Sequence, residues 1–208
     1  MEDFSFSKVT AAYFTPAQAE ALEKVTIGIA GAGGIGSNCA LMLVRSGFSR
    51  FTLVDFDTVF PSNLNRQAYS RNHIGKKKVE CLHQLCTAIN PYAEITAYTA
   101  RIDSGNVMQL FDNCDVIIEA FDDAASKALL FTSYLNSGKL LVGVSGIAGI
   151  GTTDRIGIRE IRENCFIVGD EVTGVSETVK PYAPRVMVAA AKMVDIVLEK
   201  VLNGFSTG

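Results

Sequence analysis

The sequence predicts an α/β fold, a doubly wound Rossmann-like sheet with a parallel core, an antiparallel extension and helices on both faces. Short apolar blocks alternate with amphipathic blocks along most of the 208 residues, which is typical of a parallel sheet covered on both sides. A glycine cluster follows the first apolar block, and the next apolar block ends in an aspartate, the order of a dinucleotide-binding unit. We see no repeat, linker or low-complexity segment, so residues 1–208 are expected to form one nucleotide-binding domain.

The chain is expected to open with a helical segment, residues 1–24. Within it, Thr15 has the position and chemistry of a helix N-cap, and Pro16 suits the first helical turn. The elements predicted next are a strand at 25–30, a helix over about 36–46 and a strand at 51–55. Gly47 can end the first of these helices in the left-handed conformation.

The alternation resumes after an irregular stretch, residues 56–75. The elements predicted there are a helix at about 79–89, a strand at 94–100, a helix at 104–111, a strand at 114–120, a helix at about 124–135 and a strand at 139–146. That strand is the last clear parallel element, and the block 152–168 is expected to supply one or two short strands of the antiparallel extension. A polar crossover loop at 169–184 and a C-terminal helix at 185–203 complete the prediction.

Composition narrows the class of protein. The net charge of −3 gives no basic field, which argues against nucleic-acid and membrane-surface partners. The N-terminus lacks the basic-then-apolar order of a signal peptide, and no apolar run approaches about 18 residues. Five cysteines without a C-x-x-C or a Cys/His cluster suit a reducing cytoplasm and predict no zinc site.

The glycine cluster predicts a phosphate-binding loop. Gly31, Gly33 and Gly36 fit G-x-G-x-x-G between a strand and a helix, and they would serve a tight turn, close backbone approach to phosphate and close helix–strand packing. Gly34 adds backbone freedom. Asp55 ends the second strand where a carboxylate can accept both ribose hydroxyls. A glycine turn that serves packing alone is the alternative, and the pattern does not separate NAD from ATP.

Polar side chains cluster just after Asp55, at the strand end where a doubly wound sheet binds ligands. The candidates there are Asp57, Asn63, Arg66 and Gln67. Arg66 can fork across phosphate oxygens and keeps its charge, while Asn63 can hydrogen-bond a phosphate or bridge to the loop backbone. The alternative is an ordered surface loop capped by Asn and Ser side chains.

Lys78 is the next candidate. It follows Lys76 and Lys77 at the start of a predicted helix, where a lysine opposes the helix dipole unless an anion lies opposite. Because Lys78 precedes the apolar anchor Val79, it is expected beside the buried stripe, and we choose it over its two neighbours. A solvated helix end is the alternative.

Two further aspartates follow the predicted strand 114–120. A carboxylate of Asp122 or Asp123 could hold Mg²⁺ against nucleotide phosphates, or either residue could be the N-cap of the next helix. One role each is compatible with the pattern, and we assign the metal to Asp122. Lys127 could be a surface lysine or a phosphate contact.

Four stretches together resemble the ThiF/MoeB/HesA family, which also supplies the adenylation domain of ubiquitin-activating enzymes. They are GAGGIGSN (31–38), DFDTVFPSNLNRQ (55–67), GKKKVE (75–80) with INP (89–91), and EAFDDAASKALL (119–130). The likeness covers roughly residues 20–203, and SNLNRQ after DFD is far more specific than the glycines. The short length, GDEVTGVSE and APRVM point to a compact ThiF-type sulfur carrier protein adenylyltransferase.

This resemblance implies a reaction with ATP and Mg²⁺. The C-terminal glycine carboxylate of a small ubiquitin-like sulfur carrier ending in Gly-Gly attacks the α-phosphate, which gives an acyl-adenylate and pyrophosphate. Carried onto this chain, the glycine loop and Asp55 hold adenosine, while Asn63 and Arg66 reach phosphates. Lys78 neutralises phosphate charge, and Asp122 takes the magnesium-linked role. Catalysis of this kind relies on positioning and charge neutralisation.

The chain also departs from the longer members of the family. Those relatives carry an N-terminal arginine that reaches the partner subunit's ATP in a homodimer, whereas no arginine precedes Arg45 here. Lys8 or Lys24 is a possible substitute. The zinc-binding cysteine pairs are missing, and Cys165 reads as a core residue. A homodimer is still expected, and the crossover loop 169–184 is expected to cover the carrier's tail.

Several functions stay open. A ThiS-like carrier for thiamin thiazole synthesis is favoured, and a MoaD-like or other β-grasp carrier is the alternative. An NAD-dependent oxidoreductase would account for the glycines and Asp55, but it would give Arg66 and Lys78 no role. A non-catalytic carrier-binding subunit is the third possibility, because the N-terminal arginine is absent.

Overall fold

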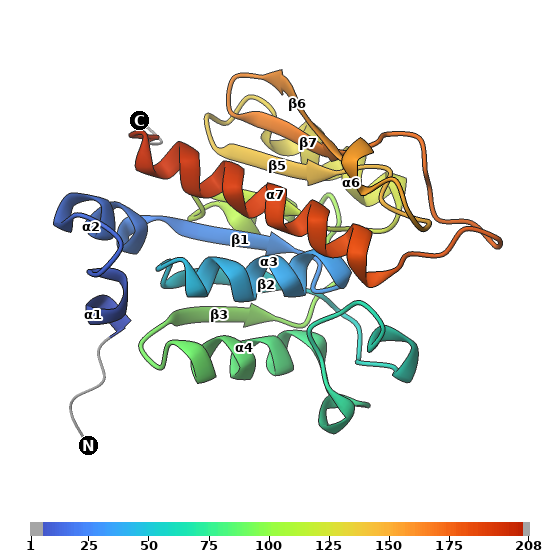
Figure 1. The fold of residues 1–208 in the computed structure, drawn as a ribbon, viewed down its shortest axis with the longest axis horizontal. Helices are drawn as coiled ribbons and strands as arrows, with labels where there is room; N and C mark the ends of the chain where they lie inside the picture. Colours follow the sequence, from blue (N-terminus) through green and yellow to red (C-terminus); the bar gives the residue numbers. More distant parts are fainter. Residues whose placement is uncertain (1–5, 206–208) are drawn as a thin grey trace.

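The computed structural model describes residues 6–205, and these fold around one seven-stranded sheet in the order β3-β2-β1-β4-β5-β7-β6 (Figure 1). The strands are β1 (Thr26–Ala30), β2 (Arg50–Val54), β3 (Glu94–Tyr98), β4 (Val116–Glu119), β5 (Leu140–Val144), β6 (Gly157–Arg162) and β7 (Cys165–Gly169). Among the strand pairings of this sheet within residues 6–205, that of β6 with β7 is antiparallel and the other five are parallel. The predicted doubly wound, Rossmann-like class is confirmed.

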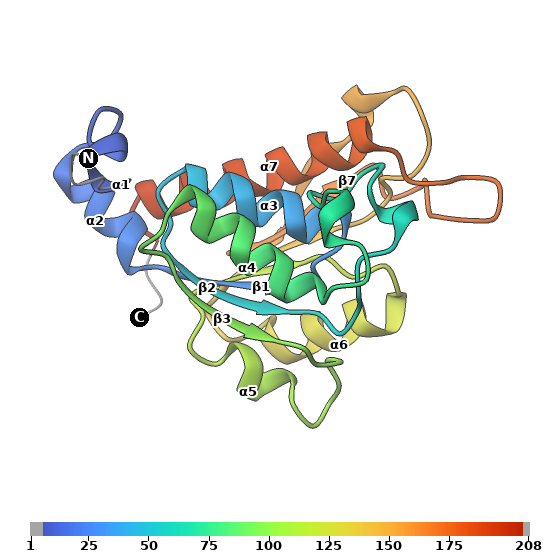
Figure 2. The same cartoon turned by 90° about the horizontal axis from the view of Figure 1, so that it is seen from below.

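Helices cover both faces of the sheet, as Figure 2 shows. They are α1 (Phe6–Thr10), α2 (Pro16–Lys24), α3 (Gly34–Arg45), α4 (Lys78–Ile89), α5 (Val107–Phe111), α6 (Ala124–Tyr134) and α7 (Ala183–Leu202). Helices α3, α4 and α7 pack on one face, and α5 and α6 on the other. In β4, Val116 and Ile118 face the first core while Ile117 faces the second, which explains why the central strands are apolar at every position.

One strand assignment from the sequence is wrong. The strand at 139–146 is not the last parallel one, because β7 runs parallel to β5 and is buried at four of its five positions. Its apolar sequence CFIVG is that of a central strand, whereas β6, exposed throughout, is the antiparallel edge. The predicted antiparallel extension is therefore a single strand.

Two helices begin at other residues than the sequence predicted, and local side chains explain the difference. The helix predicted at 104–111 begins only at Val107, because Asn106 accepts from the Asp103 backbone and Asp103 from that of Gly105, which makes a turn first. Helix α7 begins at Ala183, two residues before the predicted 185, with a proline in its first turn. Residues 1–5 of the predicted N-terminal segment lie outside the described residues.

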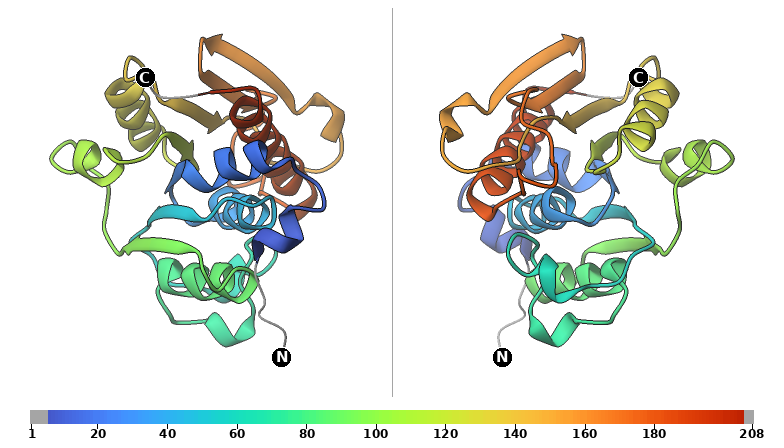
Figure 3. Two further views of the ribbon diagram at one scale, coloured as in Figure 1. Left: turned by 90° about the vertical axis from the view of Figure 1, so that its left-hand side faces the viewer. Right: turned by 90° about the vertical axis from the view of Figure 1, so that its right-hand side faces the viewer.

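The topology fixes where a ligand site can form. The parallel strands end together at one edge of the sheet, the carboxyl edge, onto which the right-hand view of Figure 3 looks. The glycine loop, the stretch after β2, the start of α4 and the loop after β4 all meet there. No helix within residues 6–205 is long and apolar enough to cross a membrane.

Candidate functional site

The glycine loop is built from backbone requirements at three positions. Gly31 has φ +100°, and a Cβ there would lie 2.9 Å from the Ala120 carbonyl oxygen. A Cβ at Gly36 would lie 1.8 Å from the carbonyl oxygen of Gly31, so α3 approaches β1 closely only because the residue is glycine. A Cβ at Gly33 would meet no atom within 4 Å. The predicted tight turn and close packing are confirmed, and open space lies where a phosphate is predicted.

Helix α3 offers its N-terminus at this loop. It begins at Gly34 with Gly33 as the N-cap, and no side chain caps it. The first N–H groups of a helix lack partners within the helix and carry partial positive charge. The loop therefore has the chemistry of an anion site.

Asp55 links the end of β2 to the glycine loop. Its carboxylate accepts the backbone N–H groups of Ala32 and Asp57, both at 2.7 Å. Burial raises the pKa of Asp55, and the nearby charge of Lys78 opposes that rise. Each carboxylate oxygen keeps a lone pair for a further donor, so the predicted ribose contact fits the geometry.

Lys78 is held between the loop after β2 and the start of α4. Its Nζ lies 2.7 Å from Oδ2 of Asp57, and the Lys78 side chain is 7% exposed against 42% for Asp57. The position beside the buried stripe is as predicted. Part of the charge conflict at the start of α4 is resolved within the protein, since the carboxylate of Asp57 is an anion opposite Lys78.

Arg66 and Asp122 share the same edge. The Arg66 guanidinium donates to the Ser62 carbonyl at 3.1 Å and to Asn65 Oδ1 at 2.7 Å, and its Cγ lies 3.5 Å from where a Gly34 Cβ would be. Burial lowers the pKa of Arg66, while the charge of Asp122 opposes the fall. Arg66 thus lies over the N-terminus of α3 and within electrostatic reach of Asp122.

The two aspartates after β4 have separated their roles. Asp123 is the N-cap of α6 and accepts the Ser126 N–H at 2.8 Å. Asp122 is exposed at the carboxyl edge, where a carboxylate remains available to a cation. The N-cap role is thus that of Asp123, and the metal role of Asp122 remains a prediction.

Comparisons with known proteins identify this architecture. The model of the ThiF family matches residues 7–200. The chain belongs to the ThiF family. It is 34% identical over 131 residues to the molybdopterin-synthase adenylyltransferase of Escherichia coli K12, which covers 62% of this chain and 51% of that protein. It is 31% identical over 124 residues to the adenylyltransferase and sulfurtransferase UBA4 of Vanderwaltozyma polyspora, covering 59% and 28%. The chain thus spans about half or less of these curated relatives.

A solved structure superposes on nearly the whole chain. The crystal structure of E. coli tRNA N6-threonylcarbamoyladenosine dehydratase, TcdA, in complex with AMP gives a TM-score of 0.85. The match covers 94% of this chain and 93% of that one at 22% sequence identity. At this identity the likeness establishes the fold alone.

Two predicted site residues of this ThiF-family chain, Asn63 and Gln67, are tied into the protein itself, the first by a hydrogen bond and the second by burial. Oδ1 of Asn63 accepts the Phe60 N–H at 2.9 Å, so its carbonyl oxygen serves the loop backbone, the second of the roles foreseen. Gln67 is 9% exposed, and its Oε1 is a buried acceptor with no hydrogen-bond partner among the described residues. A buried acceptor of this kind is commonly satisfied by an ordered water.

The sequence did not reveal the residues that hold the Arg66 segment against α3. Asn38 Nδ2 donates to the carbonyls of Gly34 and Arg66, at 2.6 and 2.9 Å. Ser37 accepts the Ala68 N–H at 3.1 Å, and Tyr69 donates to the Ala32 carbonyl at 2.8 Å. Ser37 and Asn38 lie inside the GAGGIGSN stretch, which was the one signal that could have found them.

Lys127 is bonded within the protein and is not a free surface lysine, and the phosphate contact stays a prediction. Its Nζ donates to Glu119 Oε1 at 2.8 Å and to the Val144 carbonyl at 3.0 Å. Glu119, fully buried at the end of β4, also accepts the Phe121 N–H at 2.8 Å. Burial raises the pKa of Glu119, and the charge of Lys127 opposes the rise. This pair joins β4, β5 and α6 beside Asp122.

Of the two candidates for the missing arginine, Lys24 lies away from this site. Lys24 pairs with Glu20 at 2.6 Å, at the amino end of β1. The side chain of Lys8 lies outside the described residues. Cys165 is buried, and burial raises its pKa, which makes it an inert core thiol as expected.

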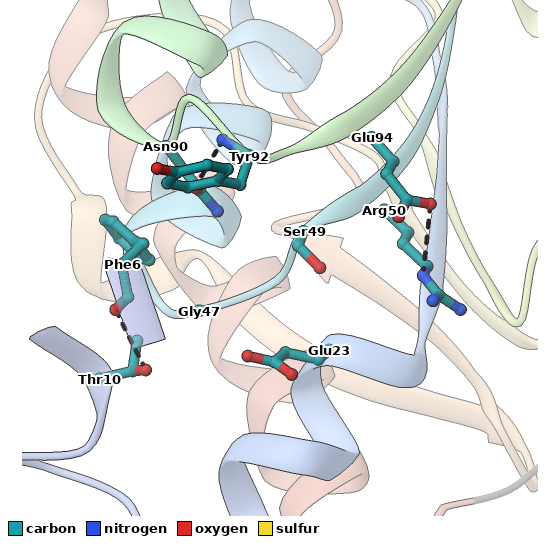
Figure 4. Close-up of a pocket in the computed structure, with 9 residues that line it drawn as sticks. All are labelled: Phe6, Thr10, Glu23, Gly47, Ser49, Arg50, Asn90, Tyr92 and Glu94. Carbon is teal, nitrogen blue, oxygen red and sulfur yellow. Dashed lines mark hydrogen bonds and ion pairs between the residues drawn. The ribbon is translucent and has the colours of Figure 1, made fainter. Parts of the chain in front are cut away.

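A cavity of about 270 Å³ lies far from these groups, at the amino ends of β2 and β3 (Figure 4). Glu23, Arg50 and Asn90 are among its lining residues. None of the predicted site residues lines it, so the candidate site is the carboxyl edge and not this cavity.

Proposed function

We propose that this chain is an ATP-dependent adenylyltransferase that activates the C-terminal glycine of a small ubiquitin-like, ThiS-like sulfur carrier, for thiamin thiazole synthesis. The observation that carries the proposal is that two charged groups of residues share the carboxyl edge: Arg66 lies at the uncapped N-terminus of α3 within electrostatic reach of Asp122, and Lys78 lies beside Asp57. Two cations, a helix N-terminus and one exposed carboxylate suit a magnesium–triphosphate group. Family membership and the names of the curated relatives support this reaction class.

The residues would divide the work by position. Asp55 would accept the ribose hydroxyls, and the N–H groups at the start of α3 would face the phosphates. Arg66, with Asn63 beside it, would contact phosphate oxygens. The Lys78 ammonium, paired with Asp57 in this structure, would also contact the nucleotide phosphates. The carrier's carboxylate oxygen bonds to the α-phosphorus, the bond from that phosphorus to the bridging oxygen breaks, and pyrophosphate leaves with the electron pair.

Mg²⁺, when bound with ATP, would neutralise charge on the phosphates, and Asp122 is the residue that would hold it. Within residues 6–205 no three His, Cys, Asp or Glu side chains gather as a metal site. The ion would therefore take most of its oxygens from phosphate and water, as Mg²⁺ commonly does in nucleotide sites.

The experiment is ATP–pyrophosphate exchange with purified protein and single carriers. Exchange is expected only when a carrier ending in Gly-Gly is present with Mg²⁺, and it should be strongest with a ThiS-like carrier. Stronger exchange with a MoaD-like carrier would support the alternative that the molybdopterin-synthase relative suggests. Carrier binding without exchange would indicate a non-catalytic subunit, and NAD(H) binding tighter than ATP binding an oxidoreductase. ATP turnover stimulated by tRNA would favour the chemistry named for TcdA.

We also propose a homodimer, as the resemblance to the longer family members implies. Light scattering during size-exclusion chromatography should give twice the mass of one chain. A single-chain mass at micromolar concentration would contradict it, and the nucleotide site would then be complete within one chain.

A further inference from the structure

Arg185, at the start of α7, connects two loops at the carboxyl edge. The residue is 1% exposed. Its Nη1 donates to the carbonyls of Gly151 and Thr152, both at 3.0 Å. Its Nη2 lies 2.6 Å from Asp170 Oδ2 and 3.0 Å from Thr173 Oγ1. A buried arginine with this many directed bonds fixes the relative position of everything it touches.

Asp170 lies at the start of the crossover segment, the residues between β7 and α7, whereas Arg185 lies just after its end. Asp170 also accepts the backbone N–H groups of Val172 and Thr173, at 2.9 and 2.8 Å. The segment between β7 and α7 therefore leaves from one member of a buried ion pair and returns to the other. Its base is closed, while its tip projects beyond the sheet at the right of Figure 1.

The loop after β5 joins the same unit. The N–H of Ala148 donates to the Thr173 carbonyl at 3.2 Å, and that of Gly149 to the Lys180 carbonyl at 2.9 Å, so this loop bridges both arms of the crossover segment. Thr152 and Glu171 adopt left-handed φ values of 52° and 57°. Arg185 binds the strained Thr152 directly, and such strain persists only where the surroundings impose it.

We name this unit the clasp: the loop 146–152, residues 170–173 and Arg185. It lies at the ends of β5 and β7, on the other side of β4 from Asp55 and Lys78. Ile150, Val172 and Val175, on the clasp and the segment it closes, are 80%, 85% and 61% exposed. These apolar side chains can contact a polypeptide chain, whereas they offer no hydrogen bond to the phosphates of a nucleotide.

We propose that Arg185 and Asp170 are positioning residues that hold the clasp rigid and thereby orient the acyl substrate, not ATP, at the carboxyl edge. The inference rests on the proposed function for the identity of that substrate. Its structural half, that the pair closes the base of the crossover segment, can be tested without any reaction.

The test compares wild type with Arg185→Lys and with the milder Thr173→Val, which removes one hydroxyl from the same cluster. Amide hydrogen exchange at Ala148 and Gly149, and Glu-C cleavage after exposed Glu177, report whether the segment stays docked. We expect both variants to speed this exchange by about tenfold or more, because the bonds lost hold the base. In pyrophosphate exchange with the best Gly-Gly carrier, the carrier KM should rise by about tenfold, while kcat and ATP affinity change less than about threefold.

Arg159→Lys is the matched control. Arg159 pairs with Glu171 of the same segment, but the two side chains are 56% and 39% exposed, and such pairs contribute little. If both clasp variants keep the amide protection of the wild type, the inference that Arg185 and Asp170 close the base of the crossover segment is overturned. Lost protection with an unchanged carrier KM, or a change confined to ATP affinity, would overturn the positioning role. If wild type exchanges with no carrier, the proposed function and the acyl-substrate role fail together, whereas amide protection still decides the closed base.

Discussion

Asp122 and Asp123 are neighbours in the chain, and Asp123 is the one whose carboxylate caps α6. Asp122→Asn is therefore expected to lower carrier-dependent exchange by about 10²-fold or more, because it removes the charge offered to the cation. Asp123→Asn should stay within about threefold of wild type, since asparagine caps a helix as well as aspartate does. Initial exchange rates at saturating ATP check both. Equal activities of the two variants would remove Asp122 from the mechanism.

Gly36 and Gly33 form a second matched pair. Gly36→Ala would force a Cβ to 1.8 Å from the Gly31 carbonyl oxygen, whereas the same change at Gly33 meets no atom within 4 Å. We expect a loss of about 3 kcal/mol or more in the free energy of unfolding for Gly36→Ala and under about 1 kcal/mol for Gly33→Ala. Urea unfolding measures both. Similar midpoints would mean that α3 can move off β1 at little cost.

Individual residues were predictable from the sequence where the backbone dictates them. Gly31 and Gly36 follow from the spacing of a turn and a helix. The partners of Asn38 and Tyr69 do not, because these side chains reach backbone atoms 28 and 37 residues away in the chain. No periodicity encodes such a contact, and the Glu119–Lys127 pair was missed because a buried acid at a strand end has the same sequence appearance as an exposed one.

Among the elements, α2 shows how a local rule can be sufficient. Thr15 accepts the Gln18 N–H at 3.3 Å, and Gln18 Oε1 accepts the Thr15 N–H at 3.0 Å, a complete capping box. Thr15→Ala should lower the free energy of unfolding by about 1 kcal/mol. Urea unfolding followed by far-ultraviolet circular dichroism measures this loss. Gln18→Ala is expected to lose less, because its backbone N–H still donates to the Thr15 hydroxyl. No loss for Thr15→Ala would show that α2 frays independently of the domain.

Strand β7 shows where local rules are insufficient. Its five residues could continue a hairpin with β6 or insert beside β5, and both pairings bury the same apolar side chains. The structure has both. The insertion of β7 beside β5 depends on the assembled sheet: β5 has an unpaired edge until β7 joins it, and α7, which follows β7, packs back across the sheet.

Across the whole molecule, ion pairs between separate segments organise the carboxyl edge. Three pairs, Lys78 with Asp57, Lys127 with Glu119, and Arg185 with Asp170, join residues 8 to 21 positions apart in the sequence, each near the end of a strand. Each pair has at least one member that is buried or nearly so. Because a buried charge left alone is costly, each pair favours one arrangement of its loops, which leaves Arg66 and Asp122 to respond to a ligand.

Acid unfolding of the whole chain tests the clasp without any ligand. Burial alone would raise the pKa of Asp170, but hydrogen bonds from Thr173, Val172 and Arg185 outweigh it and hold the pKa well below the ordinary 3.8. A carboxylate whose pKa is lower in the folded chain than in the unfolded chain stabilises the fold above the unfolded pKa, and this stabilisation is lost as the pH falls below it. Asp55 and Glu119, whose pKa values are raised, give stability the opposite dependence on pH. Both residues are present in the wild type and in the Asp170→Asn variant, so their contribution cancels in a comparison of the two.

Asp170→Asn removes this titration. The difference in free energy of unfolding between wild type and Asp170→Asn should be constant from about pH 7 to about pH 5 and should shrink progressively below about pH 4. Urea unfolding at each pH measures it, with Asp154→Asn, a change at an exposed aspartate, as the matched control variant. A difference that persisted unchanged down to about pH 2.5 would contradict a contribution that titrates between the two pKa values. It would leave packing and neutral hydrogen bonds, and not the charge of Asp170, as what closes the base of the crossover segment.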